Sequence, residues 1–144
     1  MGPGADSPPA ERSGEIGSGH GRAPRARANF EEAGLGDATR VVEEDAPTAL
    51  ASDDGRFDVC FNDLLTSFDS EESTERTFRL CLERLRPGGL LMAENALRQG
   101  EVLEPTTVPA RNVARYNRLV ATHPRLESVI VPIRDGLSVA RVRD

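Results

Sequence analysis

Oxygen-bearing side chains stand directly after two apolar segments that have the length of buried strands. Glu94 and Asn95 follow residues 90–93, and Asp63 lies just beyond residues 57–61. Ligands of open α/β sheets collect at the carboxyl ends of strands, so polar residues there indicate a site. Carboxylate and amide oxygens are ligands that suit a hard divalent cation. One interpretation of these residues is therefore a small oxygen-lined binding site for such a cation. Solvated strand ends are the other interpretation of the same residues.

The segments around these residues alternate between helical and strand patterns. We expect helices ending near residue 33, starting after Asp45, running from Asp69 to the Pro-Gly-Gly at 87–89, and covering 108–122. Strands are expected at 39–42, 58–61, 90–93, 128–133 and 137–142, and 58–61 is expected to be buried on both faces. Asp135-Gly136 between apolar runs predicts a hairpin. This order indicates an α/β fold whose mostly parallel sheet ends in an antiparallel hairpin.

Residues 1–27 have a different composition from the rest of the chain. They consist mainly of Gly, Pro, Ser, Ala and Arg, and Ile16 is their only large aliphatic residue after Met1. Such a segment cannot bury enough apolar surface to offset the entropy of its chain. We therefore expect residues 1–27 to be disordered and residues 28–144 to form the folded domain.

Composition excludes several classes of function. The 24 acidic residues outnumber the 18 basic ones, which argues against nucleic-acid binding through a basic surface. No apolar run approaches the roughly 20 residues of a membrane span, and the N-terminus lacks the apolar segment of a secretory signal. Cys60 and Cys81 fall on a predicted strand and on a helix face, where two free thiols suit a cytoplasmic location. Every basic residue is Arg, so no lysine can serve as a general base.

Short motifs recur in a characteristic order through residues 29–144. They are Asn29-Phe30, Ala33-Gly34-Leu35, Asp45-Ala46, Phe57-Asp58-Val59, Phe61, Asp63, Leu85-Arg86-Pro87-Gly88-Gly89-Leu90-Leu91, Asn95, Gly100, Pro124-Arg125-Leu126-Glu127-Ser128, Pro132-Ile133 and Asp135-Gly136-Leu137. In this order and spacing they resemble the cation-dependent O-methyltransferases that use S-adenosylmethionine, of the catechol and caffeoyl-CoA type. The resemblance implies a Rossmann-like methyltransferase fold. It also implies transfer of a methyl group to a metal-chelated hydroxyl of a small phenolic or catechol-like acceptor.

The resemblance also implies a set of site residues. The divalent cation of that family, usually magnesium, would fall to Asp63, Glu94 and Asn95. Asp63 and Gln99 would contact the substrate.

Asp45 and Ala46 occupy positions that contact the adenine of the cofactor in that family. Capping of the following helix is an equally good interpretation of Asp45.

The chain departs from the family at positions that carry chemistry. Glu94 stands where the family has Asp, and Arg98 replaces its tryptophan. Leu65 and Thr66 replace an acid that helps to hold the cofactor and a lysine that serves as base. Loss of a general base typically costs a factor of about 10² to 10⁴ in rate. We therefore assign no catalytic residue.

The front of the domain is the largest departure. Residues 15–21 are similar to the family's Gly-rich cofactor loop, but no strand is expected before them and few residues separate them from Asn29. We therefore expect an N-terminally truncated domain that lacks the first two strands of the sheet. Such a domain would be marginally stable, would pair the 39–42 strand directly with the 58–61 edge strand, or would need a partner. A homodimer is one such arrangement.

Three functions fit these observations. The chain is a working O-methyltransferase, a binding or interaction module that has kept the scaffold without the chemistry, or a truncated remnant of an enzyme. The missing base at Thr66 and the missing front favour the last two for turnover.

Overall fold

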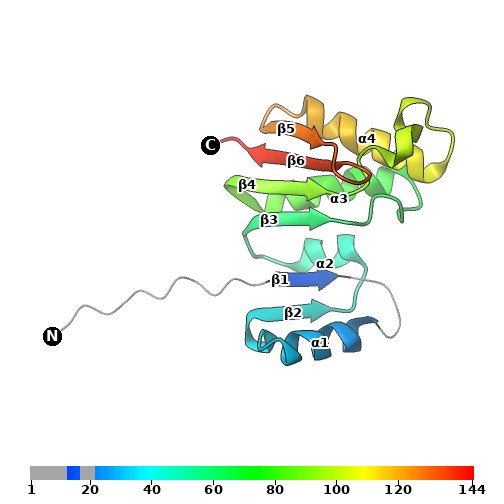
Figure 1. Ribbon diagram of the computed structural model, residues 1–144. Coiled ribbons are helices and arrows are strands. Elements are labelled where there is room, and N and C mark those ends of the chain that lie inside the picture. Colours follow the sequence, from blue (N-terminus) through cyan, green and yellow to red (C-terminus); the bar gives the residue numbers. More distant parts are fainter. Residues whose placement is uncertain (1–12, 17–21) are drawn as a thin grey trace. The chain divides into compact units, whose positions relative to one another are not determined.

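Strand pairing begins earlier in the chain than its composition predicts. The computed structural model describes residues 13–16 and 22–144, which form two units, one ending at Ala49 and the other spanning Leu50–Asp144 (Figure 1). In the first unit, strand β1 (Ser13–Ile16) pairs in parallel with β2 (Thr39–Val42). The bounds of β2 are those predicted from the sequence.

Helix α1 (Arg22–Glu32) and the 3-10 helix η1 (Gly36–Ala38) connect these two strands. Gly34 ends α1 with a φ of +72°, a conformation that glycine adopts without steric cost. Arg27 of α1 forms an ion pair with Glu43 at 2.7 Å and so ties the helix to the segment after β2. Helix α2 (Ala46–Ser52) then leads out of the first unit.

Two expectations for the front of the chain are wrong. Residues 13–16 form a strand and residues 22–27 belong to a helix, so these parts of the 1–27 segment are not disordered; residues 1–12 and 17–21 lie outside the described residues. The strand at 39–42 pairs with β1 and not with the strand at 58–61, so one short strand is present where both early strands were expected to be missing. Main-chain hydrogen bonds hold β1, and these do not depend on the apolar side chains that the composition argument counted.

The second unit contains a four-stranded mixed sheet. Its strands are β3 (Phe57–Asn62), β4 (Leu85–Ala93), β5 (Leu126–Val131) and β6 (Leu137–Val142), in the order β3-β4-β6-β5. β3 and β4 are parallel, whereas β6 is antiparallel to both β4 and β5. The predicted C-terminal hairpin is confirmed, although β5 begins and ends two residues earlier than expected.

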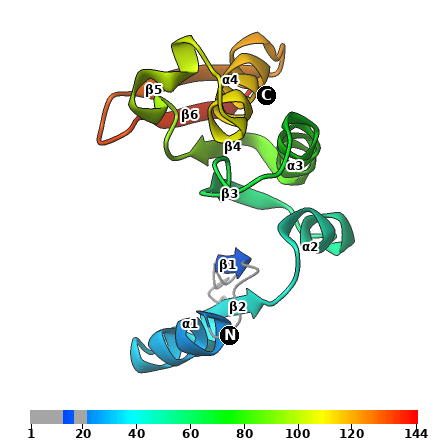
Figure 2. The ribbon, with the colours of Figure 1, turned by 90° about the vertical axis from the view of Figure 1, so that its right-hand side faces the viewer.

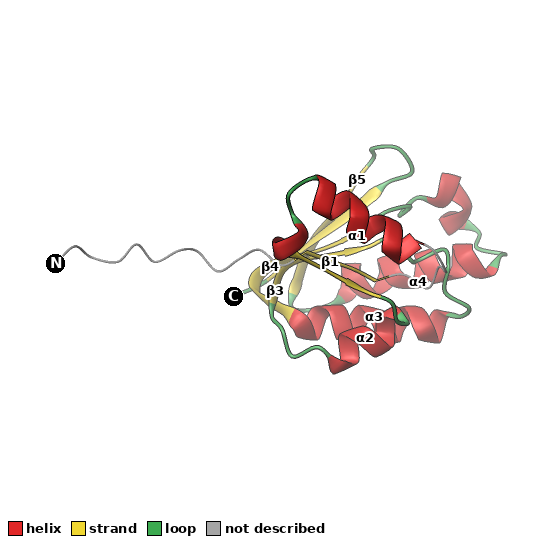
Figure 3. Cartoon of the chain, turned by 90° about the horizontal axis from the view of Figure 1, so that it is seen from below, coloured by secondary structure: helices red, strands yellow, loops and turns green. Residues whose placement is uncertain are grey.

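Helices α3 (Glu71–Arg84) and α4 (Val108–Thr122) cover one face of this sheet (Figures 2 and 3). Their apolar sides and the inward side chains of the sheet form the core, in which Phe78 and Tyr116 meet edge to face at 6.0 Å. The main buried members are Phe78, Cys81 and Leu82 of α3, Val113, Tyr116 and Val120 of α4, and Leu91, Ala93, Ala140 and Val142 of the sheet. Among the described residues no helix is long and apolar enough to cross a bilayer.

Helix α3 differs from its prediction at both ends. The helix was expected to start near Asp69, but its N-cap is Ser70, whose hydroxyl accepts a hydrogen bond from the Ser73 amide at 3.2 Å. Hydrogen bonds from Ser73 and Ser70 lower the pKa of the Asp69 carboxyl. The helix ends at Arg84, before the Pro-Gly-Gly, because β4 already begins at Leu85.

An irregularity separates the two ends of β4. Leu85 pairs with Phe57 and Leu90 with Val59, so four residues of β4 lie opposite a single residue of β3. Arg86 Nη1 donates to both carboxylate oxygens of Asp58, each at 2.7 Å. This ion pair joins the two strands at the irregularity. Such a bulge re-aims the strand without ending it.

Strand β3 is not buried on both faces, contrary to expectation. Val59 and Phe61 expose 52% and 53% of their surface. β3 is an edge strand of its sheet, and α3 and α4 cover the face opposite to the one on which Val59 and Phe61 lie. Cys60 points toward the covered face and packs against the core, and both Cys60 and Cys81 are free thiols.

We expect Gly136→Ala to destabilise the second unit by about 3 kcal/mol or more. A Cβ on Gly136, whose φ is +85°, would lie 2.6 Å from Leu97 Cγ and 2.9 Å from Leu97 N. Gly100 is the matched control, because its φ is +88° and no atom lies within 4 Å of an added Cβ. Gly100→Ala should cost only the backbone strain of about 1–2 kcal/mol. Urea unfolding measures both, and equal losses would contradict close packing of Gly136 on Leu97.

Candidate functional site

The predicted site residues of the second unit lie at the same edge of its sheet. Asn62 and Ala93 are paired at the carboxyl ends of β3 and β4, so Asp63 and Glu94 leave neighbouring strands side by side. The Glu94 amide donates to the Asn62 carbonyl at 3.4 Å and continues the pairing by one step. The structure thus brings Asp63, Glu94 and Asn95 to adjacent strand ends, as predicted. Whether they bind a cation stays a prediction.

Asn62 is a residue of this edge that the sequence interpretation missed. It is 6% exposed, and its Oδ1 accepts a hydrogen bond from the Leu64 amide at 2.9 Å. Its Nδ2 is buried without a hydrogen-bond partner among the described residues. Asn62 therefore sets the direction in which the chain leaves β3, while Asp63 beyond it is exposed to solvent. The sequence did contain a signal for Asn62, because an amide side chain stands directly after the apolar residues of the strand.

Glu94 takes part in an ion pair at this edge. Its Oε1 lies 3.3 Å from Nη1 of Arg134, whose side chain is largely exposed. An ion pair with so exposed a partner contributes about 0–1 kcal/mol. A divalent cation could therefore displace Arg134 from the Glu94 carboxylate at little cost.

Asp135 anchors the loop that follows β4. Its Oδ2 accepts a hydrogen bond from Asn95 Nδ2 at 3.4 Å, and its Oδ1 accepts one from the Gln99 amide at 2.6 Å. The Leu97 amide donates to the Asp135 carbonyl at 2.9 Å, and the Ala96 amide donates to the Gly136 carbonyl at 2.9 Å. Because Asn95 donates through its nitrogen, its carboxamide oxygen stays available as a ligand atom. The sequence had shown Asp135 only as a turn residue of the hairpin.

The same loop has an unusual backbone conformation. Asn95, Arg98 and Gln99 have φ values of 62°, 46° and 52°, in the left-handed region that non-glycine residues seldom adopt. Strained residues of this kind persist where the surrounding structure holds them, and they cluster at functional sites. Gln99, predicted to contact substrate, is exposed within the 3-10 segment η2 (Arg98–Leu103).

Asp45 and Ala46, the predicted cofactor contacts, belong to the first unit. Asp45 Oδ2 accepts hydrogen bonds from the Thr48 amide at 3.3 Å and from the Thr48 hydroxyl at 2.9 Å. This is the geometry of a helix N-cap, so the structure bears out the capping interpretation of Asp45. Contact of Asp45 and Ala46 with a cofactor stays a prediction.

The positions of the missing acid and lysine are filled differently. Leu65 is 1% exposed and belongs to the core, where a carboxylate would be costly to bury. Thr66 lies in the turn closed by the hydrogen bond from the Ser67 amide to the Leu64 carbonyl at 2.9 Å. The core therefore gains an apolar side chain at the point where the family has its acid.

His123 offers no substitute base. It ends α4, as predicted, and its ring packs against Phe78 at 5.8 Å. Its Nδ1 accepts a hydrogen bond from the Arg125 amide at 3.2 Å. Burial and the neighbouring Arg125 lower the pKa of His123.

The donor set determines what cation the edge could hold. Within the described part of the chain no group of three or more His, Cys, Asp or Glu side chains is placed to hold a metal ion. Asp63, Glu94 and Asn95 supply two carboxylates and one amide oxygen, which are hard donors. Magnesium usually binds through one or two carboxylates and keeps several waters, so this set fits it.

Comparison with known proteins places the chain among methyltransferases. Residues 21–143 match the sequence pattern of a family described as O-methyltransferase. The chain is 28% identical, over 122 residues, to a caffeoyl-CoA O-methyltransferase of Petroselinum crispum; the match covers 78% of this chain and 50% of that protein. The chain thus spans about half the length of this curated relative.

Solved structures show the same fold. An O-methyltransferase from Bacillus cereus in complex with SAH has a TM-score of 0.78 at 25% identity, over 92% of this chain and 63% of that one. The O-methyltransferase TomG from Streptomyces achromogenes, in complex with SAM, has a TM-score of 0.81 at 21% identity, over 95% and 64%. The second likeness is one of fold alone. Together they confirm the predicted α/β methyltransferase fold.

Replacing Asp135 by Ala should release the loop after β4. The variant removes the acceptor of the Gln99 amide and of Asn95 Nδ2, so we expect amide exchange at Gln99 to accelerate at least tenfold. The expected loss of stability is about 1–3 kcal/mol, because the lost hydrogen bonds go to a charged group. Asp135→Asn is the matched control, since its remaining oxygen can still accept from Gln99. Unchanged exchange at Gln99 in Asp135→Ala would show that the loop does not depend on this carboxylate.

Proposed function

Because this chain belongs to the O-methyltransferase family, we propose that it transfers a methyl group from S-adenosylmethionine to a hydroxyl of a small acceptor. The observation that carries the proposal is the family match over residues 21–143 together with oxygen donors at adjacent strand ends. The SAH in the crystallised O-methyltransferase from Bacillus cereus supports the choice of methyl donor.

We further propose a phenolic or catechol-like acceptor that offers two neighbouring oxygens. Support comes from the donor set of Asp63, Glu94 and Asn95 and from the name of the caffeoyl-CoA O-methyltransferase relative. These three residues would hold a magnesium ion. When bound, such a cation supplies Lewis acidity that lowers the pKa of an acceptor hydroxyl.

The remaining work falls to the chain's own residues. Asp135 holds the Asn95 amide nitrogen, which leaves the carboxamide oxygen for ligation, and it places Gln99 on the same loop for contact with the acceptor. Asp45 and Ala46 would contact the adenine of the cofactor. In the transfer itself the acceptor oxygen forms a bond to the methyl carbon while the carbon–sulfur bond breaks and its electron pair stays on sulfur. The hydroxyl proton leaves to water, since the sequence has no lysine to accept it.

Leu65 favours a second function, in which the chain binds ligands without turnover. This buried leucine and Thr66 stand where the family has its acid and base. A chain that kept the scaffold without them would still bind its ligands, but the bound ligands would react slowly or not at all. Rate measurement separates the two functions, because ligand binding is common to both. A homodimer and a cytoplasmic location stay predictions for either function.

Calorimetric titration with S-adenosylmethionine, with and without magnesium, tests the proposal. We expect micromolar binding and a magnesium affinity that falls at least tenfold in Glu94→Gln. Glu127→Gln is the matched control, because Glu127 also pairs with an exposed arginine, Arg143, at 3.5 Å but lies on β5. Absence of cofactor binding up to millimolar concentration would overturn the proposed activity. Equal magnesium affinities of the two variants would overturn the cation site.

Thr66→Lys should restore a general base and raise the methylation rate about 10²-fold. Ser67→Lys, one residue farther along the same turn, is the control for added charge and should leave the rate unchanged. Rates are measured with a catechol, S-adenosylmethionine and magnesium at saturating concentrations. If Thr66→Lys binds cofactor and acceptor but gives no turnover, the chain is a binding module and the missing base does not explain its inactivity.

A further inference from the structure

Arg134 stands in the turn between β5 and β6, directly before Asp135, the anchor of the loop after β4. Its φ is +52°, a left-handed conformation that glycine adopts without steric cost and that is uncommon for other residues. The Gly136 amide donates to the Ile133 carbonyl at 2.9 Å and closes the turn around Arg134. The turn therefore holds an arginine in a strained conformation, which points to a role for its side chain.

Glu94 is the ion-pair partner of this side chain. Glu94 Oε1 lies 3.3 Å from Arg134 Nη1. The Arg134 side chain is 81% exposed and that of Glu94 is 28% exposed, so the guanidinium meets the carboxylate from the solvent side. Asp135, the next residue, already accepts hydrogen bonds through both of its carboxylate oxygens. Glu94 is thus the one ion-pair partner that the described residues offer to Arg134.

A cation at the strand ends would compete with Arg134 for Glu94. Two positive charges that share one carboxylate repel each other, and an ion pair with so exposed a guanidinium is weak. Binding of the cation would therefore release the Arg134 side chain. Because the turn keeps the backbone of Arg134 in place, the released guanidinium would remain beside the site as an unpaired positive charge.

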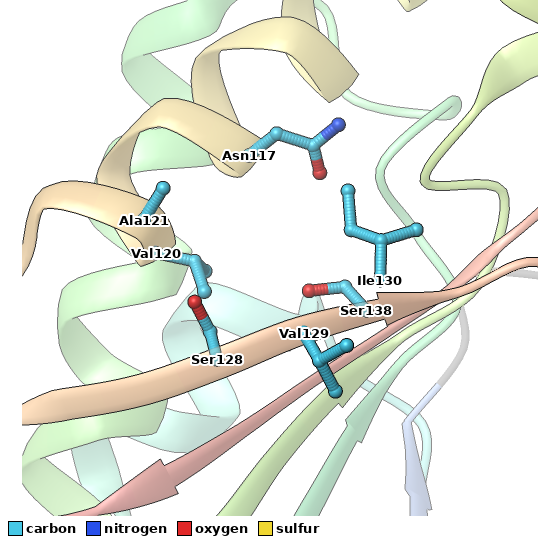
Figure 4. A pocket seen from close by; sticks show the side chains of 7 residues that line it. All are labelled: Asn117, Val120, Ala121, Ser128, Val129, Ile130 and Ser138. Carbon is cyan, nitrogen blue, oxygen red and sulfur yellow. The ribbon is translucent and has the colours of Figure 1, made fainter.

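Other described parts of this region do not supply such a charge. Arg98 Nε, at the start of η2, lies 3.5 Å from Glu101 Oε2 in an ion pair of its own. The depression between α4 and the β5–β6 hairpin is lined by uncharged residues, among them Asn117, Ser128 and Ser138 (Figure 4). An anionic ligand would lose hydration there and would find no counter-charge. The charge that a ligand group can engage at the cation site is therefore that of Arg134.

We propose that Arg134 selects an acceptor that carries a carboxylate in addition to its two neighbouring hydroxyls. Without the cation, Arg134 pairs with Glu94. With the cation on Glu94, the guanidinium pairs with the carboxylate of the acceptor, whose two oxygens match its fork of N–H donors. This inference rests on the proposed function, because it needs both the cation site and the catechol-like acceptor.

Calorimetric titration with magnesium tests the exchange at Glu94. Arg134→Ala removes the competing charge and should raise the magnesium affinity about threefold. Arg134→Lys keeps the charge and should bind magnesium as the unaltered chain does. Arg143→Ala is the matched control, because Arg143 forms a similar ion pair with Glu127 of β5 at 3.5 Å. Unchanged magnesium affinity in Arg134→Ala would overturn the proposal.

Protocatechuate, a catechol with a carboxylate, and its neutral amide test the contact with the acceptor. At saturating magnesium the unaltered chain, Arg134→Lys and Arg143→Ala should bind the carboxylate compound at least threefold more tightly than the amide. Arg134→Ala should bind the two compounds alike. A preference of unchanged size in Arg134→Ala would overturn the proposal, because the cation alone would then account for it.

The pattern of binding separates this inference from the proposed function. If the unaltered chain bound magnesium and bound both catechols equally well, the proposed function would stand and the role of Arg134 would be overturned. If the unaltered chain bound neither magnesium nor either catechol, the proposed function would fail and this inference would fail with it.

Discussion

Pairing of β4 with a strand on each side is the constraint on which the second unit depends. β3 runs parallel to β4 on one side, and β6 runs antiparallel on the other. The parallel pair brings Asp63 beside Glu94. The antiparallel pair brings the start of β6, and with it the turn at Asp135, to the same edge. Carboxyl ends of two strands and the turn of a hairpin therefore converge without any direct attraction between the acidic side chains.

The edge so formed is held chiefly by hydrogen bonds to the backbone and to one carboxylate. Asp135 accepts from both Asn95 and Gln99, and it does so for a loop whose residues have positive φ values. Strain of this kind needs compensation from neighbouring contacts. The close approach of Gly136 to Leu97, which leaves no room for a Cβ, is part of that compensation. Packing and hydrogen bonding thus preorganise Asn95 before any ligand binds.

Helix α4 contacts both the sheet and the loop that follows β4. Its buried side chains pack on the sheet, and the Asn117 Nδ2 donates to the carbonyl of Ala96 at 2.7 Å. This hydrogen bond ties α4 to the loop of the candidate cation site. In the first unit, Asp45 caps α2 by accepting hydrogen bonds from the amide and hydroxyl of Thr48.

Periodicity and strand-end chemistry in the sequence determined the α/β class, the C-terminal hairpin, the strand at 39–42 and the placement of Asp63, Glu94 and Asn95 at strand ends. These features depend on local patterns, which a single sequence carries. Other features depend on contacts between distant residues and were decided by the tertiary structure. β1 forms because Thr39–Val42 supplies main-chain partners to a segment that composition alone predicts to be disordered. β4 begins before the Pro-Gly-Gly because Leu85 finds a partner in Phe57. Asp135 lies 40 residues after Asn95 in the chain, and it reaches the Asn95 loop because β6 pairs with β4. No local sequence pattern records such a pairing.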